Sequence, residues 1–256
     1  MTGKQSHTIL ITGAAGGVGQ AAVVAAIERG YNVVALDLAE ERLKTLAHDL
    51  PADRILTIAV DVSDEDSVQE AVARGVDRFG SIDACLNNAG IGAPMKSITE
   101  LGTEEVLKVI NINTLGAFHV MKHVLRHMIP RRQGAVVNTG SILGNRGVPN
   151  YGAYCASKAA VHALTQVAAL EAAEHGVRVN AIAPGLIDTP MNDVFHAAVS
   201  PTDPDSTRRG LEAKIPVHRY ATSHEIATVA LALVSDDMSY VTGEILDVDG
   251  ALSTSF

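Results

Sequence analysis

The sequence contains no tryptophan, and its tyrosines and phenylalanines together make up only 4% of 256 residues. Only two cysteines are present, Cys85 and Cys155, and they have neither CxxC spacing nor any other spacing typical of zinc ligands. Cysteine usage therefore indicates neither a disulfide framework nor a metal site. It favours a reducing compartment, and we expect a cytoplasmic protein.

Charged residues are also scarce, at 19%, and acidic residues predominate. The 29 Asp and Glu outnumber the 20 Lys and Arg, which gives a formal net charge of −9 at pH 7. Such a charge repels phosphate backbones and anionic membrane surfaces, so we expect no nucleic-acid or membrane partner. The 47% hydrophobic content, by contrast, is enough for a large folded core and excludes intrinsic disorder.

One long stretch without charge, residues 8–27, has about the length of a membrane span. Four glycines and Gln20 occupy its centre, where a membrane helix or signal peptide would be most apolar. Each interior glycine costs a helix about 1 kcal/mol relative to alanine. We therefore interpret the stretch as a buried strand, a turn and a helix.

Short β-rich runs alternate with longer segments of helical periodicity along the chain. This alternation is typical of βαβ units, in which helices cover both faces of a parallel sheet. The predicted strands are residues 8–12, 32–37, 54–60, 82–87, 135–139, 177–183 and 244–248, and the predicted helices are 17–29, 40–50, 64–79, 103–129, 151–175 and 224–235. No linker or repeat interrupts them, so we predict a single α/β domain over residues 1–256.

Residues 189–216 depart from this pattern. Prolines 190, 201 and 204 and several charged residues make this segment polar and irregular, and it is too long for an ordinary connection. We predict that it forms a lid over the substrate site.

A glycine-rich turn follows the first predicted strand. Gly13, Gly17 and Gly19, with Val18 between the last two, would let backbone N–H groups approach a pyrophosphate at the start of a helix. Asp37 ends the second predicted strand, where a carboxylate accepts hydrogen bonds from a ribose diol. These features together predict a dinucleotide site. Asp37 would repel a 2′-phosphate and the adjacent positions offer no cation, so NAD is favoured over NADP.

A second group of polar residues lies near the middle of the chain. Ser141 follows a predicted strand, and Tyr154 and Lys158 are four residues apart on a predicted helix, so they share one face. Lowering the pKa of tyrosine from about 10 to about 7 takes about 4 kcal/mol. One cation at about 4 Å in a medium of effective dielectric constant near 20 supplies about this much. We therefore expect Lys158 to lower the pKa of Tyr154.

The sequence TGAAGGVG, the NNAG run at residues 87–90, Ser141, the YCASK run and Pro184–Gly185 occur in this order. With these motifs in this order, the chain closely resembles the single-domain short-chain dehydrogenase/reductases. The resemblance covers essentially the whole sequence. It implies a doubly wound Rossmann sheet of seven parallel strands in the order 3-2-1-4-5-6-7, and reversible hydride transfer between NAD(H) and an alcohol or carbonyl compound.

The resemblance also implies roles for individual residues. Ser141 would orient the substrate oxygen, Tyr154 would act as general acid and base, and Lys158 would bind the nicotinamide ribose. The family's catalytic asparagine, which supports a proton relay, corresponds to Asn113 rather than Asn111, because Asn113 begins the N-x-x-G-x-F pattern. The implied cofactor contacts, besides Tyr154 and Lys158, are Asp61, Val62, Asn88, Pro184, Ile187 and Thr189.

The substrate is less well defined by the sequence. The apolar residues Leu143, Val148, Met191, Val194 and Phe195 suggest a cyclic, aromatic or steroid-like secondary alcohol or its ketone. The long apolar helices 103–129 and 151–175 predict a homotetramer, as the resemblance also implies. The alternatives are an epimerase or dehydratase that uses the same Tyr and Lys, and a non-catalytic NAD-binding protein.

Overall fold

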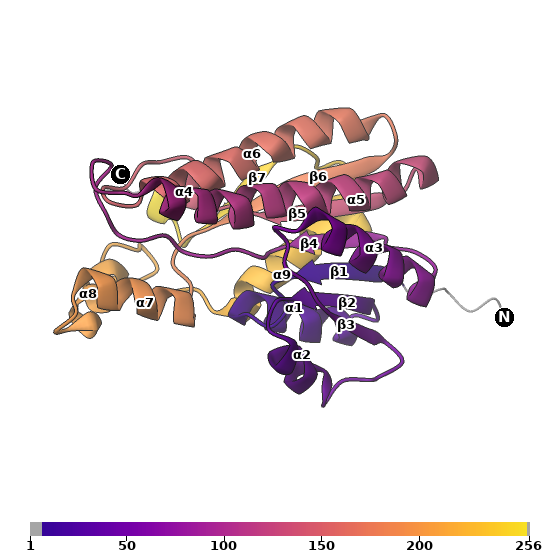
Figure 1. Ribbon diagram of the computed structural model, residues 1–256, viewed down its shortest axis with the longest axis horizontal. Helices are drawn as coiled ribbons and strands as arrows, with labels where there is room; N and C mark the ends of the chain where they lie inside the picture. The colour runs from indigo at the N-terminus through magenta and orange to yellow at the C-terminus, as the bar shows by residue number, and fades with distance from the viewer. Residues whose placement is uncertain (1–6, 255–256) are drawn as a thin grey trace.

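The computed structural model describes residues 7–254, and its strands form one parallel sheet in the order β3-β2-β1-β4-β5-β6-β7 (Figure 1). This order confirms the prediction. The strands are β1 (Thr8–Thr12), β2 (Asn32–Asp37), β3 (Ile55–Ala59), β4 (Ala84–Asn87), β5 (Gly134–Thr139), β6 (Val177–Pro184) and β7 (Ile245–Val248).

Helices cover both faces of the sheet. On one face lie α1 (Gly17–Glu28), α2 (Glu40–Ala47) and α9 (Ser223–Val234), and on the other lie α3 (Glu65–Phe79), α5 (Gly116–Arg131) and α6 (Gly152–Ala173). The short helix α4 (Thr103–Ile110) packs against α6 (Figure 1). The helices on the two faces bury one side against the sheet, so two hydrophobic layers enclose the strands.

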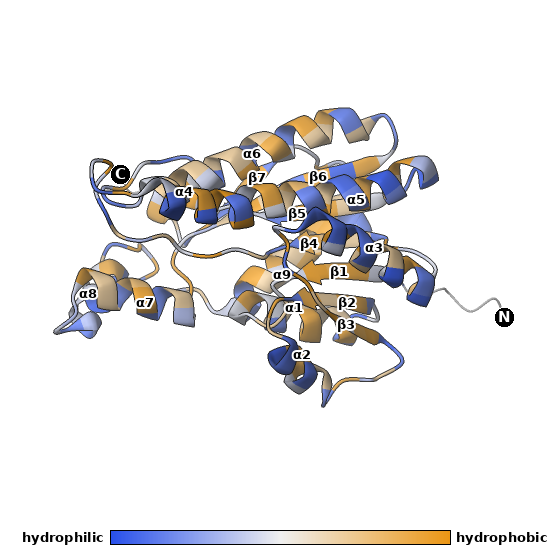
Figure 2. Cartoon of the chain, viewed as in Figure 1, coloured by the Kyte–Doolittle hydropathy of each residue, from blue (hydrophilic) through white to orange (hydrophobic). Residues whose placement is uncertain are grey.

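The strand sequences explain these two layers. Successive side chains of a strand point to opposite faces, so Ile9 and Ile11 pack with α1 and α9 while Leu10 packs on the α3 side. All three are fully buried. Figure 2 accordingly shows the central strand β1 in the hydrophobic colour, with hydrophilic residues on the outer helices. A strand buried on both sides is expected in a parallel sheet.

Two sequence predictions need correction. The predicted helix 103–129 is interrupted by a π-helical turn, Asn111–Leu115, between α4 and α5. The predicted irregular insertion 189–216 instead contains two helices, α7 (Pro190–Val199) and α8 (Pro204–Glu212). Each of these begins with a proline, which is preorganised for the first helical position and has no N–H to leave unpaired there.

No helix among residues 7–254 is long and apolar enough to cross a bilayer. The uncharged stretch 8–27 forms strand β1, a turn and most of helix α1, as predicted.

Candidate active site

The glycine-rich turn lies between β1 and α1, at the carboxyl edge of the sheet. Gly13 has φ of +63°, a left-handed conformation that favours glycine, and a Cβ there would lie 3.0 Å from the Cα of Ala89. A Cβ on Gly19 would overlap the carbonyl oxygen of Gly13. Gly19 therefore allows the first turn of α1 to pack against the loop.

A cavity of about 340 Å³ opens beside this turn. The structure brings most of the predicted cofactor residues together around it: Gly13, Gly17, Val18, Asp37, Asn88, Tyr154, Lys158, Pro184, Ile187 and Thr189. The backbone at the glycine positions leaves this space open, which fits the pyrophosphate of a dinucleotide.

Asp61 and Val62 line an adjoining cavity of about 190 Å³, together with Gly13 and Asp37. Of the predicted cofactor residues, Gly19 alone lines neither cavity, because it faces the Gly13 carbonyl group. An elongated ligand could therefore extend from the glycine-rich turn past Asp37 to Asp61 and Val62.

Asp37 is held in place by the backbone around it. Its two carboxylate oxygens accept hydrogen bonds from the N–H groups of Ala15 and Ala39, each at 2.9 Å. Arg42 lines the cavity of about 340 Å³ together with Asp37, and its guanidinium donates to the carbonyl oxygen of Ala15 at 2.9 Å. The positions adjacent to Asp37 in the sequence carry no cation, but the first turn of α2 brings Arg42 into the same cavity.

Asn88 links three strands at this edge of the sheet. Its backbone N–H donates to the Thr12 hydroxyl, its side-chain amide donates to the Thr12 carbonyl, and its side-chain oxygen accepts from the Thr139 hydroxyl. These bonds fix the ends of β1, β4 and β5 around the cavity.

Ser141, Tyr154 and Lys158 meet at the other end of the cavity. The ammonium nitrogen of Lys158 donates to the Thr139 carbonyl at 2.8 Å and lies 5.7 Å from the centre of the Tyr154 ring. Ser141 is buried just after β5 and forms a hydrogen bond with the Tyr154 hydroxyl. The serine and the phenol can therefore contact the same substrate oxygen.

The protonation of this group differs from the prediction. Burial raises the pKa of the Tyr154 phenol, the nearby Tyr151 raises it further, and the hydrogen bond with Ser141 offsets only part of the rise. Burial also lowers the pKa of Lys158 to about 8. Both shifts favour the uncharged form, as removal from water should. The expected lowering of the Tyr154 pKa by Lys158 is therefore wrong here: desolvation is the larger effect.

Asn113 lies on the π-helical turn and is buried, whereas Asn111 is exposed. Its amide oxygen accepts from the N–H of Ile91 at 2.8 Å, and its amide nitrogen donates to the Ile91 carbonyl and to the Ser157 hydroxyl. π-Helical turns are frequent at functional sites, and this one points Asn113 at the segment beside Lys158. Asn113 lines none of the cavities described here.

Tyr151 is a second tyrosine next to the site. Its ring stacks on that of Tyr154 with 4.8 Å between centres, but its hydroxyl forms a hydrogen bond with the backbone of Ala93. Burial raises its pKa. Tyr151 is therefore placed as a wall of the site.

A second cavity, of about 500 Å³, adjoins the first, and Ser141 and Tyr154 line both. Its walls come from the segment after Ser141 and from α7 and α8, including Leu143, Val148, Met191 and Phe195. These four apolar residues were predicted to line the substrate site. Val194, predicted with them, lines a neighbouring cavity instead. A volume of about 500 Å³ is typical of a pocket for a small molecule.

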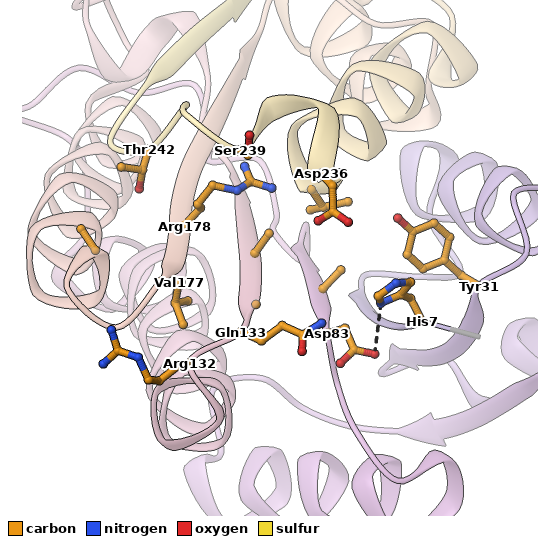
Figure 3. Close-up of a pocket in the computed structure, with 16 residues that line it drawn as sticks. His7, Tyr31, Asp83, Arg132, Gln133, Val177, Arg178, Asp236, Ser239 and Thr242 are labelled. Atoms are coloured by element: carbon orange, nitrogen blue, oxygen red, sulfur yellow. Dashed lines mark ion pairs between the residues drawn. The ribbon is translucent and has the colours of Figure 1, made fainter. Parts of the chain in front are cut away.

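A further hollow, of about 320 Å³, lies at the opposite, amino-terminal edge of the sheet (Figure 3). Two of its charged groups, Asp83 and Arg178, are already engaged. Asp83 accepts from Arg131, Ser81 and the N–H of Thr8, and Arg178 donates to the carbonyl oxygens of Leu233 and Ser235. This polar hollow therefore stabilises the edge of the sheet and shares no residue with the candidate active site.

Comparison with known proteins identifies the family. The sequence model of the enoyl-(acyl carrier protein) reductase family matches residues 13–253. Over 247 residues the chain is 40% identical to cis-4-hydroxycyclohexanecarboxylate dehydrogenase of Sinomonas cyclohexanicum, covering 94% of each chain. Over 251 residues it is 38% identical to the 3-oxoacyl-[acyl-carrier-protein] reductase FabG of Thermotoga maritima, covering 97% of this chain and 98% of the relative.

The fold agrees with this assignment. The crystal structure of levodione reductase superposes with a TM-score of 0.95 at 35% identity, covering 99% of this chain and all of the other. An NAD⁺-bound xylitol dehydrogenase has a TM-score of 0.89 at 33% identity, covering 96% of this chain and 98% of the other. An ElxO variant with NADPH bound has a TM-score of 0.88 at 31% identity, covering 97% of this chain and 99% of the other.

The doubly wound sheet and the site at its carboxyl edge are those of a dinucleotide-dependent oxidoreductase. More particularly, the chain belongs to the short-chain dehydrogenase/reductase family.

Proposed function

We propose that this protein is an NAD-dependent dehydrogenase or reductase that interconverts a ring-sized secondary alcohol and its ketone. One observation carries the proposal: Ser141 and Tyr154 line both the dinucleotide cavity and the apolar cavity beside it. A substrate oxygen that contacts these two hydroxyls would lie where the two cavities meet. Hydride transfer needs substrate and cofactor to meet in this way.

The residues of the site divide the chemistry among them. A bound nicotinamide dinucleotide supplies or accepts the hydride. Tyr154 donates a proton to the substrate oxygen during reduction and removes it during oxidation, and Ser141 holds that oxygen by a hydrogen bond. Lys158 donates a hydrogen bond to the Thr139 carbonyl beside the phenol, and in this proposal it binds the nicotinamide ribose. Asn113 holds the Ile91 segment and supports proton transfer through Lys158.

NAD is proposed rather than NADP on the basis of Asp37. Its carboxylate lines the cavity beyond the glycine-rich turn, where its remaining lone pairs can accept hydrogen bonds from a ribose diol. It would repel a 2′-phosphate at the same place. Arg42 opposes this effect, but its guanidinium is already engaged with the Ala15 carbonyl.

The substrate class rests on the second cavity and on the relatives. Its mostly apolar walls and volume of about 500 Å³ suit a carbocyclic ring. One of the relatives is named for a hydroxycyclohexane substrate, and the enzyme of the similar crystal structure is a levodione reductase.

The proposal is tested by a reductase assay that follows NADH or NADPH absorbance. Cyclohexanone and substituted cyclohexanones are compared with a 3-oxoacyl thioester, at neutral pH, where the raised pKa keeps Tyr154 protonated as a proton donor. We expect turnover of the ring ketones with NADH. Turnover of the thioester alone, or of none of these compounds, would contradict the proposed substrate class.

We also propose that the enzyme is a homotetramer. The outer surfaces of α4, α5 and α6 expose the apolar residues Leu107, Phe118, Val167 and Leu170, of which Leu170 is 82% exposed. A helix that covers a sheet buries a single apolar stripe, so these additional exposed apolar side chains need another partner. The family resemblance implies that the partner is a second copy of the chain.

Light scattering on a size-exclusion column should therefore give four times the chain mass. The Leu170→Glu substitution should lower this mass, because it introduces a charge into the contact. It should also lower activity, because Tyr154 and Lys158 lie on the same helix. A monodisperse and fully active native monomer at micromolar concentration would refute the proposal.

A further inference from the structure

Within residues 7–254, the cavity that we assign to the substrate is lined by positively charged but not by negatively charged side chains. Among the described residues that line it, two are basic, Arg146 and Lys214, and none is acidic. This is unexpected in a chain with 29 acidic and 20 basic residues. Both cations are exposed, whereas Ser141 is buried, so the positive charge lies towards the opening of the cavity.

Lys214 differs from the nearest basic residues of α8, which pair with carboxylates. Arg208, on α8, forms ion pairs with Asp188 at 2.9 Å and Glu212 at 3.0 Å. Lys214, two residues beyond the end of α8, forms no ion pair with any acid among residues 7–254. The guanidinium of Arg146, the other basic group of the cavity, donates a hydrogen bond to the Ser253 carbonyl. Within the described part of the chain, no carboxylate neutralises the charge of Lys214.

We infer that the substrate carries a carboxylate on its ring, and that Lys214 and Arg146 bind this carboxylate while Ser141 and Tyr154 bind the reacting oxygen. The inference rests on the proposed function, since it concerns the same site. A cation paired with an anion at the cavity mouth leaves the apolar walls to enclose the ring, and it would make substrate recognition depend on charge.

The experiment compares 4-oxocyclohexanecarboxylate with its methyl ester, which has the same ring and ketone but no charge. The native enzyme should have a kcat/KM about 10-fold or more higher for the acid, because a hydrogen bond to a charged group contributes about 1.5–3 kcal/mol. The Lys214→Gln substitution should remove most of this advantage by raising KM for the acid much more than KM for the ester. Lys214→Glu should make the ester the better substrate.

Arg74→Gln is the matched control. Arg74 is an exposed cation on α3 that lines none of the cavities described here, so its loss removes the same charge without touching the site. Equal kcat/KM values for acid and ester in the native enzyme, or a Lys214→Gln effect that is the same for both, would overturn the inference and leave the proposed function intact. Failure to reduce either compound would instead contradict the proposed function.

A second observation concerns His162, a buried residue of α6 that lies one turn beyond Lys158. Its Nε2 atom is 3.4 Å from the backbone nitrogen of Ser141, and its Nδ1 atom is 3.0 Å from the side-chain oxygen of Asn145. A Cβ on Gly140 or on Gly144 would overlap the imidazole ring. The loop that carries Ser141 is therefore wrapped around this histidine.

These contacts fix the tautomer of His162. The Asn145 oxygen is an acceptor, so Nδ1 carries the proton, and Nε2 is then free to accept from the Ser141 N–H. Protonation of Nε2 would place two donors against each other. Burial lowers the pKa of His162, the charge of Lys158 on α6 lowers it further, and Asp247 on β7 opposes the shift. Neutral imidazole is thus the form present at pH 7.

We propose that neutral His162 is a positioning residue, which holds the Ser141 loop in the geometry that catalysis requires. Because the folded pKa lies below the ordinary 6.5, acidification favours release of the loop, so kcat should fall only as the pH drops below 6.5. His162→Phe keeps the ring volume but cannot accept a hydrogen bond. It should lower kcat about 10-fold, remove this acid limb of the pH profile and leave the KM for the cofactor unchanged.

A double-mutant cycle distinguishes this role from a general loss of packing. In a Ser141→Ala background, His162→Phe should have little further effect on kcat, because the residue acts through Ser141. His162→Gln, which retains an acceptor, should recover part of the activity if the single variant folds poorly. An undiminished kcat and acid limb in His162→Phe, or equal losses with and without Ser141, would refute the proposal.

Discussion

Replacing Tyr154 with phenylalanine is expected to lower kcat by at least about 100-fold, because it removes the proton donor and keeps the ring. Cofactor affinity should change little, since the aromatic wall of the cavity remains. Steady-state kinetics with a ring ketone measure kcat, and quenching of NADH fluorescence measures the affinity.

Tyr151→Phe is the matched control for this experiment. It removes a hydroxyl from the ring that stacks on Tyr154 at 4.8 Å, but that hydroxyl forms a hydrogen bond with the backbone of Ala93. Most of the activity should remain. If Tyr151→Phe were the inactive variant and Tyr154→Phe the active one, the assignment of the acid would be wrong.

Replacing Asp37 with alanine should raise the KM for NAD by about 10- to 100-fold, because the ribose loses hydrogen bonds to a charged acceptor, each of about 1.5–3 kcal/mol. The same substitution should improve the use of NADP, since the repulsion disappears while Arg42 remains in the cavity. Values of kcat/KM with both cofactors measure the change.

Asp37→Asn separates charge from hydrogen bonding. The asparagine oxygen can still accept from one of the two backbone N–H groups that Asp37 now binds, but the charge is gone, so rejection of NADP should relax with a smaller loss of NAD binding. Arg42→Ala should weaken any use of NADP. A native enzyme that works equally well or better with NADPH would contradict the cofactor assignment.

The sequence predicted the sheet and most of the site for a physical reason. Buried strands and a glycine-rich turn are specified locally, and the YCASK run places Tyr154 and Lys158 on one helix face whatever the rest of the fold does. The choice of Asn113 over Asn111 also agrees with its burial in the structure.

Other features depend on contacts between distant segments. Arg42 reaches the Asp37 cavity only because α2 turns back over the loop after β1, and the wrapping of the Ser141 loop around His162 depends on how α6 packs. The protonation of Tyr154 depends on burial, which no local pattern reports. The helices α7 and α8 were foreseeable, because Thr189–Pro190 and Asp203–Pro204 are typical helix starts that the irregular interpretation overlooked.

In the proposed reaction, a hydride passes between a ring carbon and the cofactor. The most direct test uses a ring alcohol that the enzyme oxidises, labelled with deuterium at the carbinol carbon. We expect mass spectrometry to find one equivalent of deuterium in the reduced NAD for each ketone formed, and we expect this transfer to be lost in Tyr154→Phe. Epimerised or dehydrated product without net formation of reduced cofactor would contradict it.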